Sequence, residues 1–347
     1  MAKKAPTGPS GLIVVDKPAG LTSHDVVSKM RWIAGTRKVG HAGTLDPMAT
    51  GVLILGVNKA TRLLTWVVGE TKTYTATIRL GVSTLTDDAD GEATAVANDG
   101  ALDSISEDAI RQHIADLTGD IMQVPSAVSA IKVNGVRSYA RVRSGEEVEL
   151  EARPITVHSF DLHEARPATA TYQLGDEEVS TSVLDLDVTV VCSAGTYIRA
   201  LARDLGAALG TGAHLTALRR TAIGEIRAED AHTLDELIAG REAEQAAPLL
   251  PIEEAARRLF AVRNLTAAEA TDLANGRRII PTEGSPATTA PKTGSTGGYD
   301  KPTTTGLTAA FAPNGTLVAI IENTRFRREN VAAPVLVFEA GTTFKEN

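Results

Sequence analysis

Cysteine, aromatic residues and long apolar runs are scarce in this sequence. The first and the last of these shortages each exclude a class of protein. The single cysteine, Cys192, rules out disulfides within the chain. Phe, Trp and Tyr make up 4% of the 347 residues, and no apolar run approaches the roughly 20 residues of a membrane-spanning helix. Residues 1–10 are polar rather than an apolar signal core. We therefore expect a cytoplasmic protein that does not enter a membrane.

Patterns for binding metals and nucleotides are absent too. The seven histidines form no His-x-x-x-His or His-Glu-x-x-His grouping, so a zinc site would need scattered ligands. The stretch 35–40 has the two glycines of a phosphate-binding loop, but His41 follows where Lys and then Ser or Thr are required. We expect neither a metal nor a cofactor.

Positive charge is scarce overall but concentrated near the N-terminus. The formal net charge of -8 argues on average against a nucleic-acid partner, because Lys and Arg make most phosphate contacts. Residues 1–80 nevertheless hold 11 Lys and Arg against 4 Asp and Glu, a balance of +7. Residues 81–120 hold 1 against 10, a balance of -9. Such segregation permits one face to attract RNA while the molecule stays acidic.

The periodicity of apolar residues predicts strands of a mixed α+β fold. They are expected at 11–16, 73–80 and 183–191. In the second run, Tyr74 shares a face with Ile78 because side chains alternate along a strand. Cys192 follows the third run, so we expect it to be buried in a strand rather than to be a reactive thiol.

Helices are expected between these strands. Ser23 begins an amphipathic stretch that Gly35 closes, which predicts a capped helix. Ser106 begins another, and a third follows Gly195 with Arg199 in about its first turn. Because no Gly-x-Gly-x-x-Gly element occurs, antiparallel strands are favoured over a doubly wound sheet.

The composition changes near the C-terminus. Residues 281–306 are almost entirely Pro, Thr, Gly, Ser, Ala and Lys, which predicts a surface insertion without a core. A capped helix is expected from 265 onward, and short strands at 307–318 and 335–338 with an Asn-Gly hairpin turn at 314–315. We therefore divide the chain into a first domain, 10–250, and a small C-terminal module, 251–347.

The densest group of chemically useful residues is the stretch 40–51. Three glycines and Pro47 enforce a tight loop around one carboxylate, Asp46. An isolated Asp-Pro more often starts a turn. Because the sequence shows no metal-binding pattern and no phosphate-binding loop, the remaining functional interpretation is that the Asp46 carboxylate takes part in the chemistry directly. Such a carboxylate needs a cation to keep it ionised, and Arg199 is the best candidate, although an exposed helical arginine is the alternative.

Two rings have both a functional and a structural interpretation. Tyr74 is a candidate stacking platform for an extruded base, although core filling is the commoner role of a single tyrosine. His41 is interpreted as an RNA contact, although a lone histidine is more often structural.

These motifs resemble those of the TruB family of tRNA pseudouridine synthases. The two most specific are Asp-Lys-Pro-Ala-Gly-Leu-Thr-Ser at 16–23 and Gly-His-Ala-Gly-Thr-Leu-Asp-Pro at 40–47. Further agreement lies in 72–74, 123–127, 130–135 and 195–201. The resemblance spans roughly residues 10 to 235.

The resemblance implies a pseudouridine synthase fold, with a curved, mixed, mainly antiparallel sheet and a cleft across its middle. It implies uridine 55 in the T loop of tRNA as the substrate. It makes Asp46 the catalytic aspartate, Tyr74 the base-stacking tyrosine and Arg199 the ionic partner of the aspartate. The C-terminal part resembles a PUA-type RNA-binding module, from which the insertion 281–306 departs.

The resemblance also implies a set of substrate-binding residues. His41 matches the histidine associated with flipping the nucleotide, Leu218 a leucine of the pocket, and Asp88 a partner of Arg199. The set is completed by residues of the two motifs, Lys17, Pro18, Gly43 and Thr44.

The reaction would need no cofactor, because cleaving N1 from C1′, turning the uracil and rejoining it through C5 changes no oxidation state. Attack of Asp46 on C1′, its addition to C6 and its abstraction of the C2′ proton all remain open. The alternative function is a non-catalytic protein that binds or folds tRNA through the same cleft. We expect a stand-alone monomer that binds the T arm, rather than a guide-RNA-dependent rRNA synthase.

Overall fold

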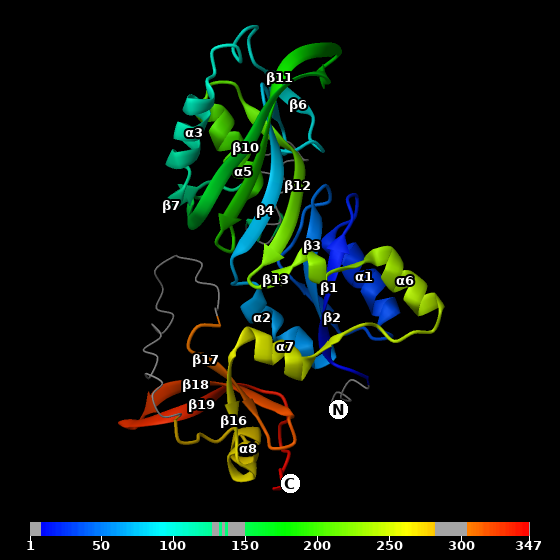
Figure 1. Ribbon diagram of the computed structural model, residues 1–347, viewed down its shortest axis with the longest axis vertical. Coiled ribbons are helices and arrows are strands. Elements are labelled where there is room, and N and C mark those ends of the chain that lie inside the picture. The colour runs from blue at the N-terminus through cyan, green and yellow to red at the C-terminus, as the bar shows by residue number, and fades with distance from the viewer. Residues whose placement is uncertain (1–7, 127–131, 134–135, 138–149, 282–303, 347) are drawn as a thin grey trace.

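One large sheet, helices on both of its faces and a smaller C-terminal sheet make up the molecule (Figure 1). The computed structural model describes residues 8–126, 132–133, 136–137, 150–281 and 304–346. The motif at 130–135 and the insertion 281–306 lie mostly outside these ranges, so what was predicted for them stays a prediction.

The large sheet is mixed and mainly antiparallel, as predicted. Its eleven strands, counted over the described residues, follow the order β14-β1-β3-β12-β4-β11-β10-β7, with β2 on β3, β13 on β12 and β15 on β1. Within this sheet only two described pairs, β1 with β14 and β3 with β12, are parallel. The strands are β1 Gly11–Lys17, β2 Val39–Ala42, β3 Thr50–Val57, β4 Lys72–Leu80, β7 Gly119–Gln123, β10 Arg153–Leu174, β11 Glu177–Cys192, β12 Ala213–Ile223, β13 Ile226–Arg227, β14 His232–Thr233 and β15 Leu250–Pro251.

Helices and two small hairpins complete this part. The helices are α1 Ser23–Ile33, α2 Leu64–Val67, α3 Glu107–Asp116, α5 Ile198–Ala208, α6 Leu234–Glu242 and α7 Ile252–Leu259, with 3-10 turns at Asn58–Arg62 and Ala228–Asp230. The hairpins pair β5 Val82–Thr84 with β6 Ala93–Val96, and β8 Lys132–Val133 with β9 Val136–Arg137. The helices predicted after Ser23, Ser106 and Gly195 are therefore confirmed.

Strands β1 and β3 are apolar along their length because both of their faces are buried. Ile13 and Leu53 belong to a core shared with α1, α5 and α6. Leu12 and Ile54 belong to a second core shared with α2 and α7. Because successive side chains of a strand point to opposite faces, burial on both sides gives a continuous apolar run. One pair of strands thus joins the two cores.

The smaller sheet packs on the second of these cores. It has the order β16-β17-β18-β19, with β16 Ala261–Asn264, β17 Leu307–Phe311, β18 Leu317–Phe326, β19 Glu329–Val337 and helix α8 Ala267–Ala274. Phe311 and Phe338 lie in the second core together with Trp66 of α2. Lys59 pairs with Glu339 at 2.5 Å, which adds an ion pair to this contact.

The C-terminal strands differ from the prediction in length. The turn at 314–315 is confirmed, but β18 continues to Phe326 and β19 begins at Glu329. The first added residues, 319–321, are buried, whereas residues 322–331 around the turn of this ribbon are half-buried or exposed. Backbone pairing continues there without a buried face, so apolar periodicity gave no signal for it.

The cap of α1 also differs from the prediction. Thr22, not Ser23, is the N-cap: its hydroxyl accepts from the Asp25 amide, and the Asp25 carboxylate accepts from the Thr22 amide. This reciprocal pair satisfies two donors at the helix start. The Ser23 hydroxyl is thereby left to bond elsewhere, to the loop described below.

Cys192 lies at the end of β11 and is buried, as predicted. Burial raises the pKa of its thiol to about 11. The thiol is therefore protonated at neutral pH, which makes it unreactive.

Two glycines offer a test of how closely β3 and β12 approach. Gly51 has φ +97°, and a Cβ there would lie 2.2 Å from the Arg220 carbonyl oxygen, whereas Gly20 has φ +83° and nothing within 4 Å. We expect Gly20→Ala to lower the free energy of unfolding by about 1–2 kcal/mol, the cost of a left-handed residue. Gly51→Ala should lose about 1–3 kcal/mol more, because the strands must separate. Urea unfolding measures both, and equal losses would contradict the close approach.

Candidate active site

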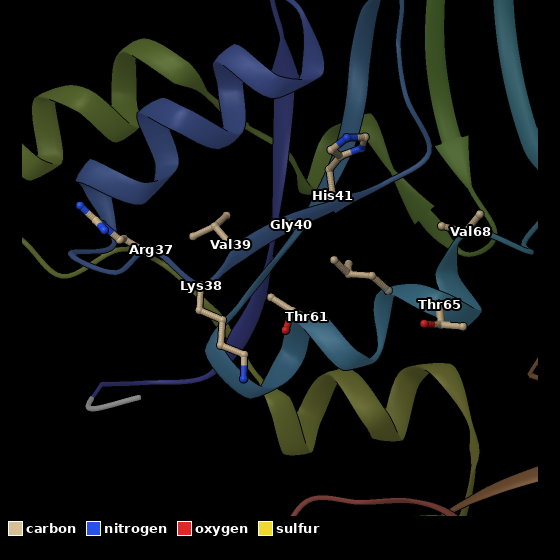
Figure 2. Close-up of a pocket in the computed structure, with 9 residues that line it drawn as sticks. Arg37, Lys38, Val39, Gly40, His41, Thr61, Thr65 and Val68 are labelled. Atoms are coloured by element: carbon tan, nitrogen blue, oxygen red, sulfur yellow. The ribbon is translucent and has the colours of Figure 1, made fainter. Parts of the chain in front are cut away.

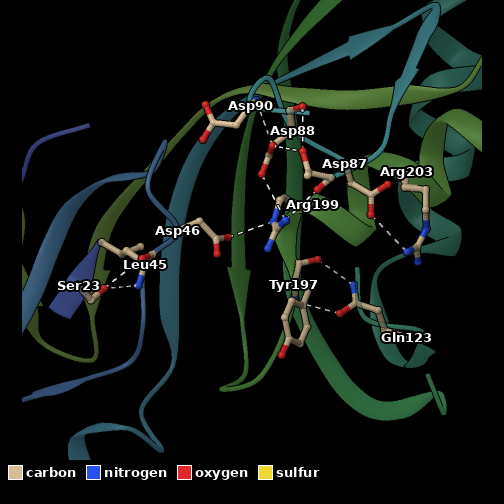
Figure 3. A network of polar contacts seen from close by, with 11 residues as sticks. Ser23, Leu45, Asp46, Asp87, Asp88, Asp90, Gln123, Tyr197, Arg199 and Arg203 are labelled. Carbon is tan, nitrogen blue, oxygen red and sulfur yellow. Dashed lines mark hydrogen bonds and ion pairs between the residues drawn. The ribbon is translucent and has the colours of Figure 1, made fainter. Parts of the chain in front are cut away.

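The loop 43–49 between β2 and β3 holds Asp46 at the middle of the large sheet. Its carboxylate is 37% exposed, and Oδ2 lies 3.1 Å from Nε of Arg199 (Figure 3). The structure thus brings together the two residues that the sequence paired. The two side chains form an ion pair at the edge of the loop.

Arg199 lies in the first turn of α5 and is almost fully buried, with 5% of its side chain exposed. Its Nη1 lies 3.3 Å from Asp88 Oδ2 and donates to the Thr86 carbonyl oxygen at 2.8 Å. The Asp88 carboxylate in turn accepts from the Thr86 hydroxyl and, at 3.1 Å, from the Asp90 amide. A buried guanidinium with this many partners has a fixed orientation, so one edge always faces Asp46.

Helix α5 is tied down at two further points. The Gln123 amide group donates to the Tyr197 carbonyl oxygen at 3.0 Å and accepts from the Tyr197 amide at 2.9 Å. Arg203, one turn beyond Arg199, lies 3.4 Å from Asp87 and donates to the Val124 carbonyl oxygen at 2.7 Å (Figure 3). Burial raises the pKa of Asp87, and Arg203 opposes that shift. Consecutive aspartates thus hold two arginines on one face of the helix.

Residues of β1 and α1 anchor the Asp46 loop through hydrogen bonds to its backbone. The Ser23 hydroxyl donates to the Leu45 carbonyl oxygen at 3.1 Å and accepts from the Leu45 amide at 2.9 Å. Lys17 is buried, and its Nζ donates to the carbonyl oxygens of Pro18, Leu21 and Pro47 at 2.8, 2.6 and 3.1 Å. Burial lowers the pKa of Lys17 to about 8, and nearby Asp46 opposes that shift.

Arg220 of β12 fixes the other end of the loop. It is 1% exposed, and it donates to the carbonyl oxygens of Gly43 at 2.9 Å and Val52 at 2.8 Å. Sequence reasoning missed it, although its position two residues after Leu218 on a strand places both on one face. Tyr74 of the neighbouring β4 is also buried; burial raises the pKa of its hydroxyl, and Arg220 opposes the rise.

A cavity of about 220 Å³ opens between this loop, β4, β12 and the start of α5. Six of the predicted residues line it, namely Gly43, Thr44, Asp46, Tyr74, Arg199 and Leu218. The sequence analysis did not single out Lys72, Tyr197 or Arg220, which line it as well. Of the described residues on its wall, only Asp46 has a carboxylate.

The other four predicted residues lie around this cavity rather than in it. Lys17 and Pro18 lie beneath the loop, and Asp88 lies behind Arg199. His41 lines a separate depression of about 540 Å³, in which Arg37 and Lys38 lie on the side opposite Thr65 and Val68 (Figure 2).

His41 is held in that depression by packing. Its ring meets His24 edge to face with centroids 5.4 Å apart, and burial lowers its pKa. Its Nδ1 is buried and, within the described residues, has no hydrogen-bond partner. Val68 lines both the depression and the Asp46 cavity, so the two are neighbours.

The described residues offer neither a metal-binding cluster nor a helix that could span a membrane. No group of three or more His, Cys, Asp or Glu side chains there is placed to hold a metal ion. No helix in the same part of the chain is long and apolar enough to cross a bilayer.

Comparison with known families gives two matches that adjoin one another. Residues 31–198 match the TruB family pseudouridylate synthase (N terminal domain), and residues 199–257 match the tRNA pseudouridylate synthase B C-terminal domain. The second match includes α5 and β12 of the large sheet, so it is not the module predicted at 251–347.

Curated relatives match over nearly the whole chain. The tRNA pseudouridine synthase B of Arthrobacter sp. (strain FB24) is 55% identical over 95% of this chain and 96% of its own length. That of Streptomyces coelicolor is 50% identical over 94% of this chain and 97% of its own length.

Solved structures share the fold. An H/ACA RNP bound to a substrate RNA containing 2'-deoxyuridine has a chain with a TM-score of 0.61 and 23% identity, covering 96% of this chain and 87% of that one. The archaeal box H/ACA sRNP Nop10-Cbf5 complex gives 0.61 and 22%, covering 97% and 88%. At these identities the likeness concerns the fold alone.

Two serines of α1 test how the Asp46 loop is held. We expect Ser23→Ala to lower the free energy of unfolding by about 1–3 kcal/mol, because it leaves buried backbone groups of Leu45 without a partner. Ser28→Ala is the matched control, since that exposed hydroxyl only donates to the His24 carbonyl oxygen of its own helix. Amide exchange at Leu45 should accelerate in the first variant alone. Unchanged exchange there would contradict the anchoring role.

Proposed function

We propose, because the chain belongs to the TruB family of pseudouridylate synthases, that it converts uridine 55 in the T loop of tRNA to pseudouridine. Isomerisation of uridine in tRNA follows from the family and from relatives that are 50–55% identical over almost the full length. The position of the uridine, the flipping of the base and the role of the aspartate are our inferences from the motif resemblance, and the site is compatible with them.

The observation that supports the proposal best is the buried Arg199 beside Asp46 in the cavity. The reaction breaks the N1–C1′ bond, turns the uracil and forms a C5–C1′ bond; C5 loses a proton and N1 gains one. It therefore needs an ionised carboxylate, proton transfers and positioning. Asp46 is the one carboxylate on the described wall, and the ion pair with Arg199 orients it. Attack on C1′, addition to C6 and deprotonation of C2′ all fit this placement.

The size and lining of the cavity fit one extruded base. Its volume of about 220 Å³ lies below the roughly 300–1,000 Å³ of most ligand pockets. Extrusion costs a few kcal/mol of stacking and pairing, which stacking on Tyr74 and packing against Leu218 would offset. His41, next to the cavity, would contact the RNA that flanks the extruded nucleotide.

The remaining expectations form part of the same proposal. Residues 10–250 would be the catalytic domain and 251–347 a PUA-like RNA-binding module with the insertion 281–306. The enzyme would act as a cytoplasmic monomer on the T arm, without a cofactor.

The decisive assay uses purified protein and an unmodified tRNA transcript, with EDTA and no added cofactor, followed by chemical mapping of pseudouridine. We expect conversion at the T-loop uridine alone. Asp46→Asn should slow single-turnover conversion by about 10²- to 10⁴-fold or more and leave tRNA binding intact, because it removes the charge but keeps the size. Asp161→Asn, which alters an exposed carboxylate on β10, is the control. Tight binding without conversion by the unaltered protein would favour the non-catalytic tRNA-binding function.

Substitutions of Tyr74 separate its ring from its hydroxyl. Tyr74→Leu removes the stacking surface and should slow conversion by about 5- to 150-fold, with a smaller effect on tRNA binding. Tyr74→Phe keeps the ring and should stay close to the unaltered rate. Single-turnover rates and dissociation constants decide between the roles, and equal losses in both variants would contradict stacking.

A further inference from the structure

The β18–β19 hairpin of the C-terminal sheet extends beyond the other strands and ends in an unusual turn (Figure 1). Phe326 pairs with Glu329, so the loop has two residues, Arg327 and Arg328. Both lie in the left-handed region, with φ +48° and +74°. Two-residue hairpin loops of this geometry favour Asn-Gly or Asp-Gly. Two arginines are poor choices for this backbone, which indicates that their side chains serve another purpose.

The arginines of this turn surround an exposed aromatic ring. Phe326 is 39% exposed, with the guanidinium carbon of Arg278 3.7 Å and that of Arg327 5.3 Å from the ring centroid. Arg325 and Arg328 are exposed beside it. We call these five residues, Arg278, Arg325, Phe326, Arg327 and Arg328, the arginine tip.

Within the described part of the module, the arginines of the tip have no acidic partner. Among the described residues, no carboxylate lies within ion-pair distance of its four arginines, and Glu329 is the one acidic residue of the turn. Two arginines nearby do have partners: Arg263 pairs with Glu269 at 2.6 Å and Arg277 with Asp272 at 3.1 Å. On a chain of formal net charge -8, this is a local concentration of positive charge.

We propose that the arginine tip binds the sugar–phosphate backbone of tRNA outside the T arm, an inference that rests on the proposed function. Guanidinium groups match phosphate geometry, and an exposed ring flanked by arginines suits stacking on an unpaired base. The tip belongs to the C-terminal module, whereas the Asp46 cavity lies in the large sheet, so a T-loop base in the cavity leaves the tip to another part of the same RNA (Figure 1).

The test compares two RNAs and two variants that lose the same charge. The tip variant combines Arg325→Gln, Arg327→Gln and Arg328→Gln. The control combines Arg111→Gln, Arg258→Gln and Arg277→Gln, three exposed arginines paired within or beside helices. The RNAs are a full-length unmodified tRNA transcript and a hairpin of the T arm alone.

We expect the tip variant to bind full-length tRNA about tenfold more weakly near 0.1 M salt. The slope of log Kd against log salt should fall by about one for each phosphate group that the variant no longer binds. Its binding and conversion of the T-arm hairpin should equal those of the unaltered protein, and the control should change neither RNA. Phe326→Leu should weaken full-length tRNA binding alone.

Three outcomes would overturn the proposal: no effect on either RNA, equal weakening of both, or a loss confined to binding of anionic lipid vesicles. Failure of the proposed function has a different signature, since the unaltered protein would then convert neither RNA. Thermal unfolding of both variants should match the unaltered protein, because every altered side chain is exposed; a destabilised tip variant is replaced by Arg325→Gln alone, with the same expected split between the RNAs.

Discussion

A buried arginine shared by two carboxylates is the interaction on which the site depends. Arg199 lies between Asp46 and Asp88, and the environments of the two acids differ. Asp88 is buried and fully engaged, so it holds the guanidinium in place, whereas Asp46 is partly exposed and faces the cavity. The Arg199 guanidinium is therefore fixed by Asp88 on one side and contacts Asp46 on the side that faces the cavity. Burying it would be unfavourable without both partners.

The rest of the fold serves to keep that arrangement rigid. The Asp46 loop is held by buried groups from three directions, Ser23 of α1, Lys17 of β1 and Arg220 of β12. Most of the acceptors are backbone carbonyl oxygens, so the path of the loop is fixed through its backbone, while the side chains of Thr44 and Asp46 line the cavity. Preorganised polar groups of this kind need no rearrangement when charge develops during a reaction.

Sequence reasoning located several of the strands and helices around the site, but neither β3 nor β12, and not the supports of the Asp46 loop. Periodicity gave β1, β4, β11 and α5, and the glycine-rich stretch around Asp46 indicated where a carboxylate meets a close backbone approach. The pseudouridine synthase fold expected from the motifs is the fold observed. Arg220 and the contact of Ser23 with the loop were missed because both depend on long-range contacts: each side chain binds the backbone of a distant segment, and sequence patterns do not reveal which carbonyl oxygen it will bind. The pairing of Asp88 with Arg199 was expected from the motif resemblance, whereas the pairing of Asp87 with Arg203 appeared only once α5 was placed beside the acidic run.

The two faces of β1 and β3 have a consequence for how this protein could have been assembled. Leu12 and Ile54 share a core with Phe311 and Phe338, far away in the chain. Cutting the chain before the C-terminal sheet would leave part of that face open, because the apolar residues of β17 and β18 and Phe338 would be lost from this core. The large sheet, which holds the Asp46 loop, would keep its strands but would expose an apolar surface that favours aggregation. A chain that emerges from the ribosome N-terminus first must therefore keep one side of its finished sheet unsatisfied until its last strands arrive.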